Sequence, residues 1–225
     1  MRILAFLLAL AAASAPASAQ PPAEAIRTLD SIRRDFPIDH QAIAATLAGK
    51  SPEEIRRLAY AGIDRFLRSR SAAILAAPGP SLVAIEARQA ALLRALGRQD
   101  VRLCATVGDR GFFSAEALAG AAPAGLDDYG VALVAAAKAG AGAASAPTVA
   151  TKEDFLAWLR AVEKIEPGVP VWAMLQDREL RARSTPDQLC RGAAAMHEAV
   201  AALPPGRNER LARTLLRSVV GSSAP

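Results

Sequence analysis

Residues 184–206 read STPDQLCRGAAAMHEAVAALPPG, and their pattern predicts a helix with a defined start and a sharp end. Thr185 stands before Pro186, and Gln188 follows three residues after the threonine, which is the arrangement of a capping box with a first-turn proline. The two prolines and the glycine at 204–206 then stop the helix. The apolar positions between these signals recur at helical spacing: Leu189, Ala193, Met196, Val200 and Leu203.

This helix places one of the chain's two cysteines against the core, because Cys190 lies beside the apolar stripe. His197 follows two turns later on the same flank. A second helix, of basic character, extends to about Val220, so we expect the two helices to form a hairpin. Beyond this architecture, the residues of the segment do not specify a reaction.

The composition favours an all-α protein. Alanine is abundant, aromatic residues are only 4% of the 225 residues, and β-branched residues never gather into an alternating run. Small side chains of high helix propensity let helices pack closely. The sequence therefore predicts a single all-α domain over residues 20–225, a bundle of about eight helices.

The first nineteen residues predict a secretory signal peptide. Arg2 supplies the positive charge, residues 3–13 form the apolar region, and Ala17-Ser18-Ala19 is a small-residue cleavage site. The apolar region is much shorter than the roughly 20 residues that span a bilayer, which favours cleavage over an uncleaved membrane anchor. We expect the mature chain to begin at Gln20, to have no transmembrane span, and to be periplasmic or secreted.

The two cysteines, Cys104 and Cys190, are interpreted as a disulfide. In an oxidising compartment a buried pair usually joins, and this bond would close a loop of about 86 residues, worth about 4 kcal/mol on a chain-entropy basis. Two alternatives stay open: two buried free thiols, or a reactive nucleophile at one of them. The nucleophile is the weaker alternative, because no cysteine-protease signature surrounds either residue.

Other helix signals are spread along the chain. Ser51 and Glu54 make a capping box with a first-turn proline, and the helix that follows should run to about Ala77. Ser81 is expected to start a further helix, closed by Gly97 in a left-handed C-cap. The remaining expectations are short helical turns at 114–119, a helix at 126–139 and another from Thr151 to Glu166.

Two segments are ambiguous from sequence. Residues 101–107, which include Cys104, suit a short helix or an extended segment equally well, because the apolar run is too brief. Residues 140–150 are rich in glycine and alanine and predict a flexible surface loop. The alternative is a linker between two lobes, which the proposed disulfide disfavours because it ties across the loop.

Both tryptophans, Trp158 and Trp172, fall within fifteen residues of one another. Core packing is the simpler interpretation of the pair. The other interpretation is an aromatic anchor for a ligand or a partner protein, since tryptophan is a frequent anchor at binding surfaces.

Catalytic motifs are weak. His197-Glu198 resembles the start of a zinc motif, but the position four residues after the histidine is Ala201, so the motif fails. We expect no metal, because the chain has two histidines and its two cysteines are expected to pair. We expect no cofactor, because neither a dinucleotide fingerprint nor a phosphate-binding loop is present. A carboxylate pair, Glu163 with Glu166, is the remaining enzymatic feature, and we expect both side chains on a solvated helix face.

The last predicted helix presents a basic side. The formal net charge of the chain is +5, and four arginines recur along one side of this helix. Such a side could contact an anionic surface or an acidic protein, or it could simply be solvated. Nucleic acid is disfavoured by export and by the lack of interleaved aromatic residues. The candidate residues are Arg207, Arg210, Arg213 and Arg217.

The sequence thus favours an exported, non-enzymatic binding protein of the cell envelope. Its partner would be another envelope protein or an anionic surface, and one version is a periplasmic protector or adaptor. The alternative is an envelope hydrolase that uses carboxylate side chains as acid and base. The sequence does not indicate the oligomeric state.

Overall fold

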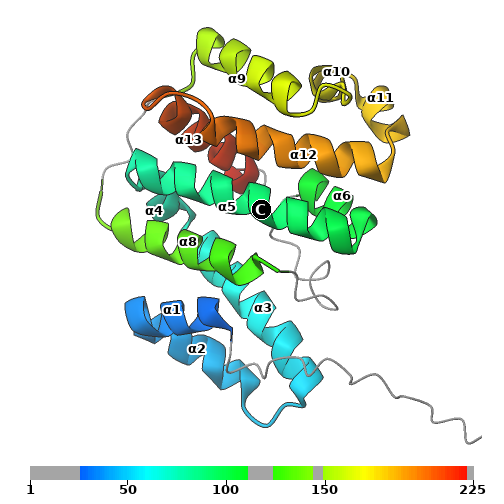
Figure 1. Ribbon diagram of the computed structural model, residues 1–225. Coiled ribbons are helices and arrows are strands. Elements are labelled where there is room, and N and C mark those ends of the chain that lie inside the picture. Colours follow the sequence, from blue (N-terminus) through cyan, green and yellow to red (C-terminus); the bar gives the residue numbers. More distant parts are fainter. Residues whose placement is uncertain (1–25, 111–123, 144–148, 222–225) are drawn as a thin grey trace, which may run out of the picture.

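The computed structural model describes residues 26–110, 124–143 and 149–221, and within them it contains helices and no strand (Figure 1). The predicted all-α class is confirmed. The signal peptide expected at 1–19 and the turns expected at 114–119 lie outside the described residues, as do residues 144–148 of the expected loop. The helices are α1 (Arg27–Asp35), α2 (Pro37–Leu47), α3 (Pro52–Ser69), α4 (Ser71–Ala76), α5 (Gly79–Gln99), α6 (Val101–Arg110), α8 (Leu126–Ala139), α9 (Lys152–Ile165), α10 (Val171–Gln176), α11 (Arg178–Arg183), α12 (Pro186–Ala201) and α13 (Arg207–Gly221).

The expectation of about eight helices is wrong, since the described residues alone contain twelve. Part of the excess comes from short helices that sequence periodicity cannot resolve, such as α10 and α11. The helix expected to run to Ala77 is also broken at Arg70, which separates α3 from α4. The guanidinium of Arg70 lies over the rings of Phe36 and Phe66 and pairs with Asp39. The break therefore falls at a residue whose side chain contacts other segments, which local helix preference does not take into account.

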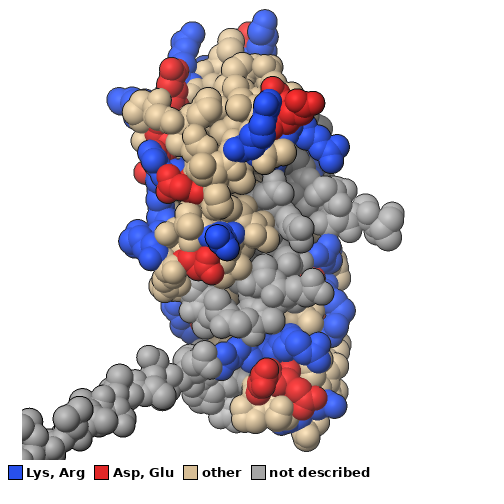
Figure 2. Space-filling model, turned by 90° about the vertical axis from the view of Figure 1, so that its right-hand side faces the viewer, with Lys and Arg blue, Asp and Glu red and all other residues tan. Residues whose placement is uncertain are grey.

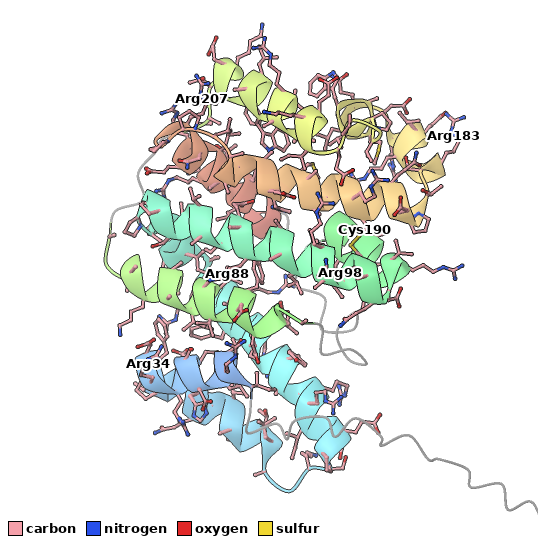
Figure 3. The ribbon with its side chains drawn as sticks, in the orientation of Figure 1. Arg34, Arg88, Arg98, Arg183, Cys190 and Arg207 are labelled. Atoms are coloured by element: carbon pink, nitrogen blue, oxygen red, sulfur yellow. A yellow bond between two sulfur atoms is a disulfide. The ribbon has the colours of Figure 1, made fainter. Side chains whose placement is uncertain are left out.

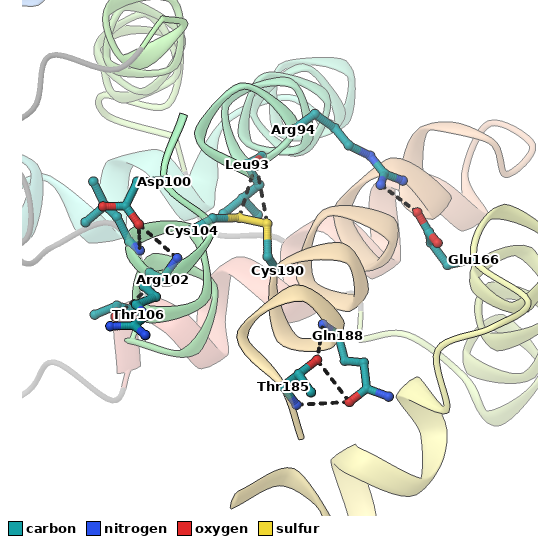
Figure 4. Close-up of a disulfide and its surroundings, with 11 residues drawn as sticks. Leu93, Arg94, Asp100, Arg102, Cys104, Thr106, Glu166, Thr185, Gln188 and Cys190 are labelled. Atoms are coloured by element: carbon teal, nitrogen blue, oxygen red, sulfur yellow. Dashed lines mark hydrogen bonds and ion pairs between the residues drawn. A yellow bond between two sulfur atoms is a disulfide. The ribbon is translucent and has the colours of Figure 1, made fainter. Parts of the chain in front are cut away.

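The capping boxes are formed as the sequence indicates. The hydroxyl of Ser51 accepts a hydrogen bond from the backbone N–H of Glu54, and the glutamate carboxylate accepts one from the backbone N–H of Ser51. Thr185 and Gln188 make the same reciprocal pair at the start of α12 (Figure 4). These local contacts satisfy backbone donors that a helix start leaves without partners.

Helix α5 forms the centre of the molecule. Figure 1 shows it between α8 on one side and α12 on the other, with α9 on the far side of α12. Alanines dominate the buried face of α12, and their small side chains allow close helix packing. The fully buried large apolar side chains of α5 are Leu82, Ile85, Leu92, Leu93 and Leu96.

Cys104 on α6 and Cys190 on α12 are bonded, as predicted, with their sulfur atoms 2.03 Å apart (Figure 4). The segment around Cys104 is helical, which settles the ambiguity at 101–107. Gly97 does not end its helix in a left-handed conformation, because α5 continues to Gln99. A Cβ atom at Gly97 would lie 2.8 Å from the sulfur of Cys190. This glycine therefore makes room for the disulfide.

Candidate functional site: an apolar groove between α9 and α10

One face of α9 is held against the core. Its helix starts at the capping box of Thr151 and Asp154, and its buried residues include Trp158 and Val162. The indole Nε1–H of Trp158 donates a hydrogen bond of 2.8 Å to the backbone carbonyl of Met196 on α12. Trp158 is only 3% exposed, so this member of the predicted tryptophan pair lies in the core.

The opposite face of α9 is exposed. Leu156, Arg160 and Glu163 follow one another at helical spacing, and all three side chains are accessible. Leu159 lies beside them and is half-buried. The outer face of α9 therefore combines an apolar end with one positive and one negative side chain.

Helix α10 is short and has two different faces. Val171 and Met174 are buried, and Val171 packs against Gly192 of α12, where an added Cβ would lie 3.2 Å from a valine methyl. Trp172 and Leu175 point outward, with 54% and 46% of their surface exposed. The second predicted tryptophan thus lies at the surface, on a helix that the core holds in place.

The outer faces of α9 and α10 enclose a groove with a volume of about 620 Å³. Val162, Val169 and Val171 are the buried members of its lining. The described residues expose five large hydrophobic side chains, and three of them lie on α9 and α10. The remaining lining residues are Leu156, Leu159, Arg160, Glu163, Pro167, Pro170, Trp172 and Ala173.

The side of the molecule that carries α10 has an area with few charged side chains. Figure 2 shows the side of the molecule that carries α10 and α11. Uncharged residues form a continuous area over its upper part, at the height of α9 to α12, and most Lys, Arg, Asp and Glu side chains stand at the edges. Depletion of charged side chains at the centre with charged side chains at the rim is a feature of protein contact surfaces.

Glu166 fastens the turn that joins α9 to α10. Its carboxylate accepts a 2.6 Å hydrogen bond from Arg94 of α5 and a 2.5 Å hydrogen bond from Arg191 of α12 (Figure 4 shows the Arg94 contact). The expectation of a solvated Glu166 is wrong, because these two arginines draw the carboxylate to 7% exposure. Burial raises the pKa of Glu166, but the hydrogen bonds from Arg191 and Arg94 outweigh burial and hold this pKa below its usual value.

The two carboxylates of the predicted pair therefore differ in environment. Glu163 is exposed on the groove wall and forms no ion pair with any described residue. Glu166 is ionised and bound to two arginines, whereas a general acid needs a pKa near the working pH. The arrangement gives the groove a fixed edge and gives no support to paired acid and base chemistry.

Two of the four predicted arginines bind a buried carboxylate. Arg207 and Arg210 of α13 donate hydrogen bonds of 3.0 and 2.8 Å to Asp154 at the start of α9. Figure 3 shows Arg207 between α13 and α9. The hydrogen bonds from Arg210 outweigh burial and hold the pKa of Asp154 well below its usual value. These side chains therefore tie α13 to α9.

The other two arginines lie in different surroundings. Arg213 is buried, and its guanidinium donates to the backbone carbonyls of Leu75 and Ala77 at the end of α4. Burial lowers the pKa of Arg213 from its usual value. Arg217 is exposed. Three of the four predicted arginines thus already have partners within the protein, and anion binding by this side stays a prediction.

A polar contact that sequence analysis missed lies between α5 and α12. The imidazole Nδ1 of His197 is 2.5 Å from a carboxylate oxygen of Glu86, and both residues are buried. Tyr129 of α8 donates a 3.3 Å hydrogen bond to the nearby Gln89. Burial, and then the charge of Glu86, raise the pKa of Tyr129. The available signal was a glutamate one turn after Leu82, on the apolar face of a predicted helix.

No protein-family model, curated protein or solved structure matches this chain. Among the described residues, no group of three or more His, Cys, Asp and Glu side chains is placed to hold a metal ion. Across the same ranges, no helix combines the length and the apolar character needed to cross a membrane.

Proposed function

We propose that this protein is an exported, non-enzymatic binding protein of the cell envelope, and that the groove between α9 and α10 is its protein-contact surface. One observation carries the proposal: two of the five large hydrophobic side chains exposed in the described residues, Leu156 and Trp172, line this groove, and a third, Leu175, lies on α10 outside its lining. Scattered exposed apolar residues are ordinary, but a cluster with a polar rim marks an interaction site. Tryptophan is also among the residues that contribute most to protein binding.

The rigidity of the groove supports binding to a protein. The buried face of α10 packs on α12, and Glu166 holds the preceding turn with hydrogen bonds to two other helices. Trp172 is therefore presented on a fixed support and loses little freedom when a partner covers it. The open shape of the groove suits side chains projecting from another protein surface.

The proposed compartment rests on separate arguments. A disulfide between Cys104 and Cys190 fits an oxidising environment outside the cytoplasm. The N-terminal pattern of a charged start, an apolar run and a small-residue cleavage site supports export. A protector or adaptor role in the periplasm is compatible with a rigid helical protein that has one apolar contact surface.

The proposal is preferred to the two rival interpretations. The hydrolase needs a carboxyl group that can donate a proton, and Glu166 has the opposite shift in pKa. The anionic partner needs available arginines, and Arg207, Arg210 and Arg213 all bind groups within the protein. By contrast, no described part of the chain covers the exposed side chains of Leu156 and Trp172 in the apolar groove.

Position-specific photo-crosslinking tests the proposal. A photoreactive phenylalanine analogue placed at Leu156, in cells that make the protein, should form a covalent adduct with a partner. The adduct should disappear when the same chain also carries Trp172→Ser, because the other end of the contact surface is then lost. A probe at Arg65, which is exposed on α3, a helix that Figure 1 shows away from α9 and α10, is the matched control and should form no such adduct. Equal labelling from both positions, or an adduct that does not depend on Trp172, would refute the proposal.

A further inference from the structure

The outer face of α9 carries one positive and one negative side chain, which could pair with the same two side chains of a second copy of the helix. Arg160 and Glu163 lie one turn apart on the same face, and both are exposed. Neither side chain makes a hydrogen bond or ion pair with any other residue in the described ranges. These two opposite charges lie one turn apart on the groove wall and have no partners among the described residues. A complementary surface would place a negative charge opposite Arg160 and a positive charge opposite Glu163.

A second copy of α9 running in the opposite direction has that reverse order. If a twofold axis passes between Arg160 and Glu163, the arginine of each copy meets the glutamate of the other. A twofold interface uses the same patch on both subunits, so each such contact is made twice. The pairing therefore satisfies all four charges with one arrangement.

The same twofold rotation also brings the apolar side chains at the two ends of the groove into contact with one another. Leu156 lies near the start of α9, and Trp172 lies on α10, which Figure 1 shows beyond the C-terminal end of α9. Reversing one copy brings the Trp172 end of each groove to the Leu156 end of the other. Each exposed tryptophan then covers an exposed leucine, which removes both apolar side chains from water.

We infer that the occupant of the groove is a second copy of this chain, bound as an antiparallel twofold dimer with its axis between Arg160 and Glu163. This inference rests on the proposed function, because it names the partner of the same contact surface. An unrelated partner would need a matching charge order and apolar spacing of its own. The second copy supplies both without any further assumption.

Charge reversal tests the arrangement. In R160E both meeting points of the homodimer bring two carboxylates together, and in E163R both bring two guanidinium groups together. Each variant alone should dimerise about ten- to a hundredfold more weakly than the wild type, because like charges across an interface are repulsive. An equimolar mixture of the two variants should regain association, since the acidic copy then faces the basic copy at both points. The double variant R160E/E163R should regain it as well.

Sedimentation velocity of the purified, oxidised chain measures these outcomes, and circular dichroism checks that the variants are folded. Both side chains are exposed and lack partners among the described residues, so the reversals should leave the spectrum unchanged and, at concentrations where all the chains are monomeric, the melting temperature nearly unchanged. A wild-type chain that stays monomeric, or a dimer that both reversals leave intact, overturns the inference. Failure of the mixture to associate, with both variants folded, also overturns it.

The two proposals can fail separately. The probe at Leu156 should yield an adduct of two copies of this chain. A Trp172-dependent adduct with a different protein would refute the dimer and leave the proposed contact surface in place. No adduct at all would refute both.

Discussion

His197 and Glu86 stand 111 residues apart in the sequence and meet at 2.5 Å inside the interface of α12 and α5. The second oxygen of the Glu86 carboxylate is buried and has no hydrogen-bond partner among the described residues. The histidine is therefore the main polar support for a carboxyl group placed in the middle of the core. A contact of this kind is costly to break from one side only.

The first prediction concerns this pair. His197→Ala should lower the free energy of unfolding by about 1–3 kcal/mol, because it leaves the Glu86 carboxyl group buried without its hydrogen-bond partner. Replacing both residues, as Glu86→Met with His197→Leu, should cost much less than the single change, because no buried polar group is then left alone. Urea unfolding of the single and double variants measures the coupling. Additive losses would show that the two side chains do not support each other.

The second prediction concerns Asp154. Asp154→Asn should lower the free energy of unfolding by about 2 kcal/mol at neutral pH, because it removes charged hydrogen bonds from Arg207 and Arg210. Glu153→Gln, which changes an exposed neighbour, is the matched control and should have little effect.

The effect of Asp154 should depend on pH with a defined sign. The pKa of Asp154 is depressed in the folded protein, so its stabilisation is fully present above the unfolded pKa of about 4. It is lost as the pH falls below that value toward the folded pKa. The difference in stability between the wild type and Asp154→Asn should therefore become smaller in acid. Thermal unfolding at a series of pH values measures this difference. A difference in stability that stays the same at all pH values would contradict a stabilising role of the ionised Asp154 carboxylate.

The third prediction concerns Gly97 and the disulfide. Gly97→Ala should destabilise the protein by about 1–3 kcal/mol, because the new methyl group would lie 2.8 Å from the sulfur of Cys190. In a background that carries Cys104→Ala and Cys190→Ala, the same change should be neutral or stabilising, since alanine is preferred to glycine inside a helix. Chemical denaturation of the four proteins tests this reversal of sign. The same sign in both backgrounds would contradict the steric explanation.

The fourth prediction separates the two tryptophans. Trp158→Ala should cost about 3–5 kcal/mol, because it removes a buried ring and its hydrogen bond to Met196. Trp172→Ala should change the stability of the monomer by less than about 0.5 kcal/mol, because its ring is more than half exposed. Acrylamide quenching provides a second readout. In dilute solution, Trp172→Ala should remove the quencher-accessible fluorescence and leave the shielded component.

Several features of this protein follow from neighbouring residues in the chain. The capping boxes at Ser51 and Thr185 form because side chain and backbone partners lie three residues apart. These contacts form between residues close together in the sequence, so they do not depend on how the helices pack. The helical class follows from composition and periodicity in the same way, and the pairing of Cys104 with Cys190 follows because the chain has two cysteines.

Other features were decided only when distant segments came together. Glu166 is buried because Arg94 and Arg191 converge on it from two other helices, and Arg210 is engaged because Asp154, 56 residues earlier, lies next to it. Local sequence shows each of these side chains as a solvated charge. Their partners depend on how the helices pack, and periodicity within one helix contains no information about the charge that a neighbouring helix presents.

The same division holds for the candidate site. The sequence by itself marked Trp158 and Trp172 as a pair of possible anchors. Only the tertiary structure placed Trp158 in the core and Trp172 at the surface, because α9 and α10 turn different faces toward α12. A helix has one buried stripe, and the position of that stripe is set by its neighbours as well as by its own residues.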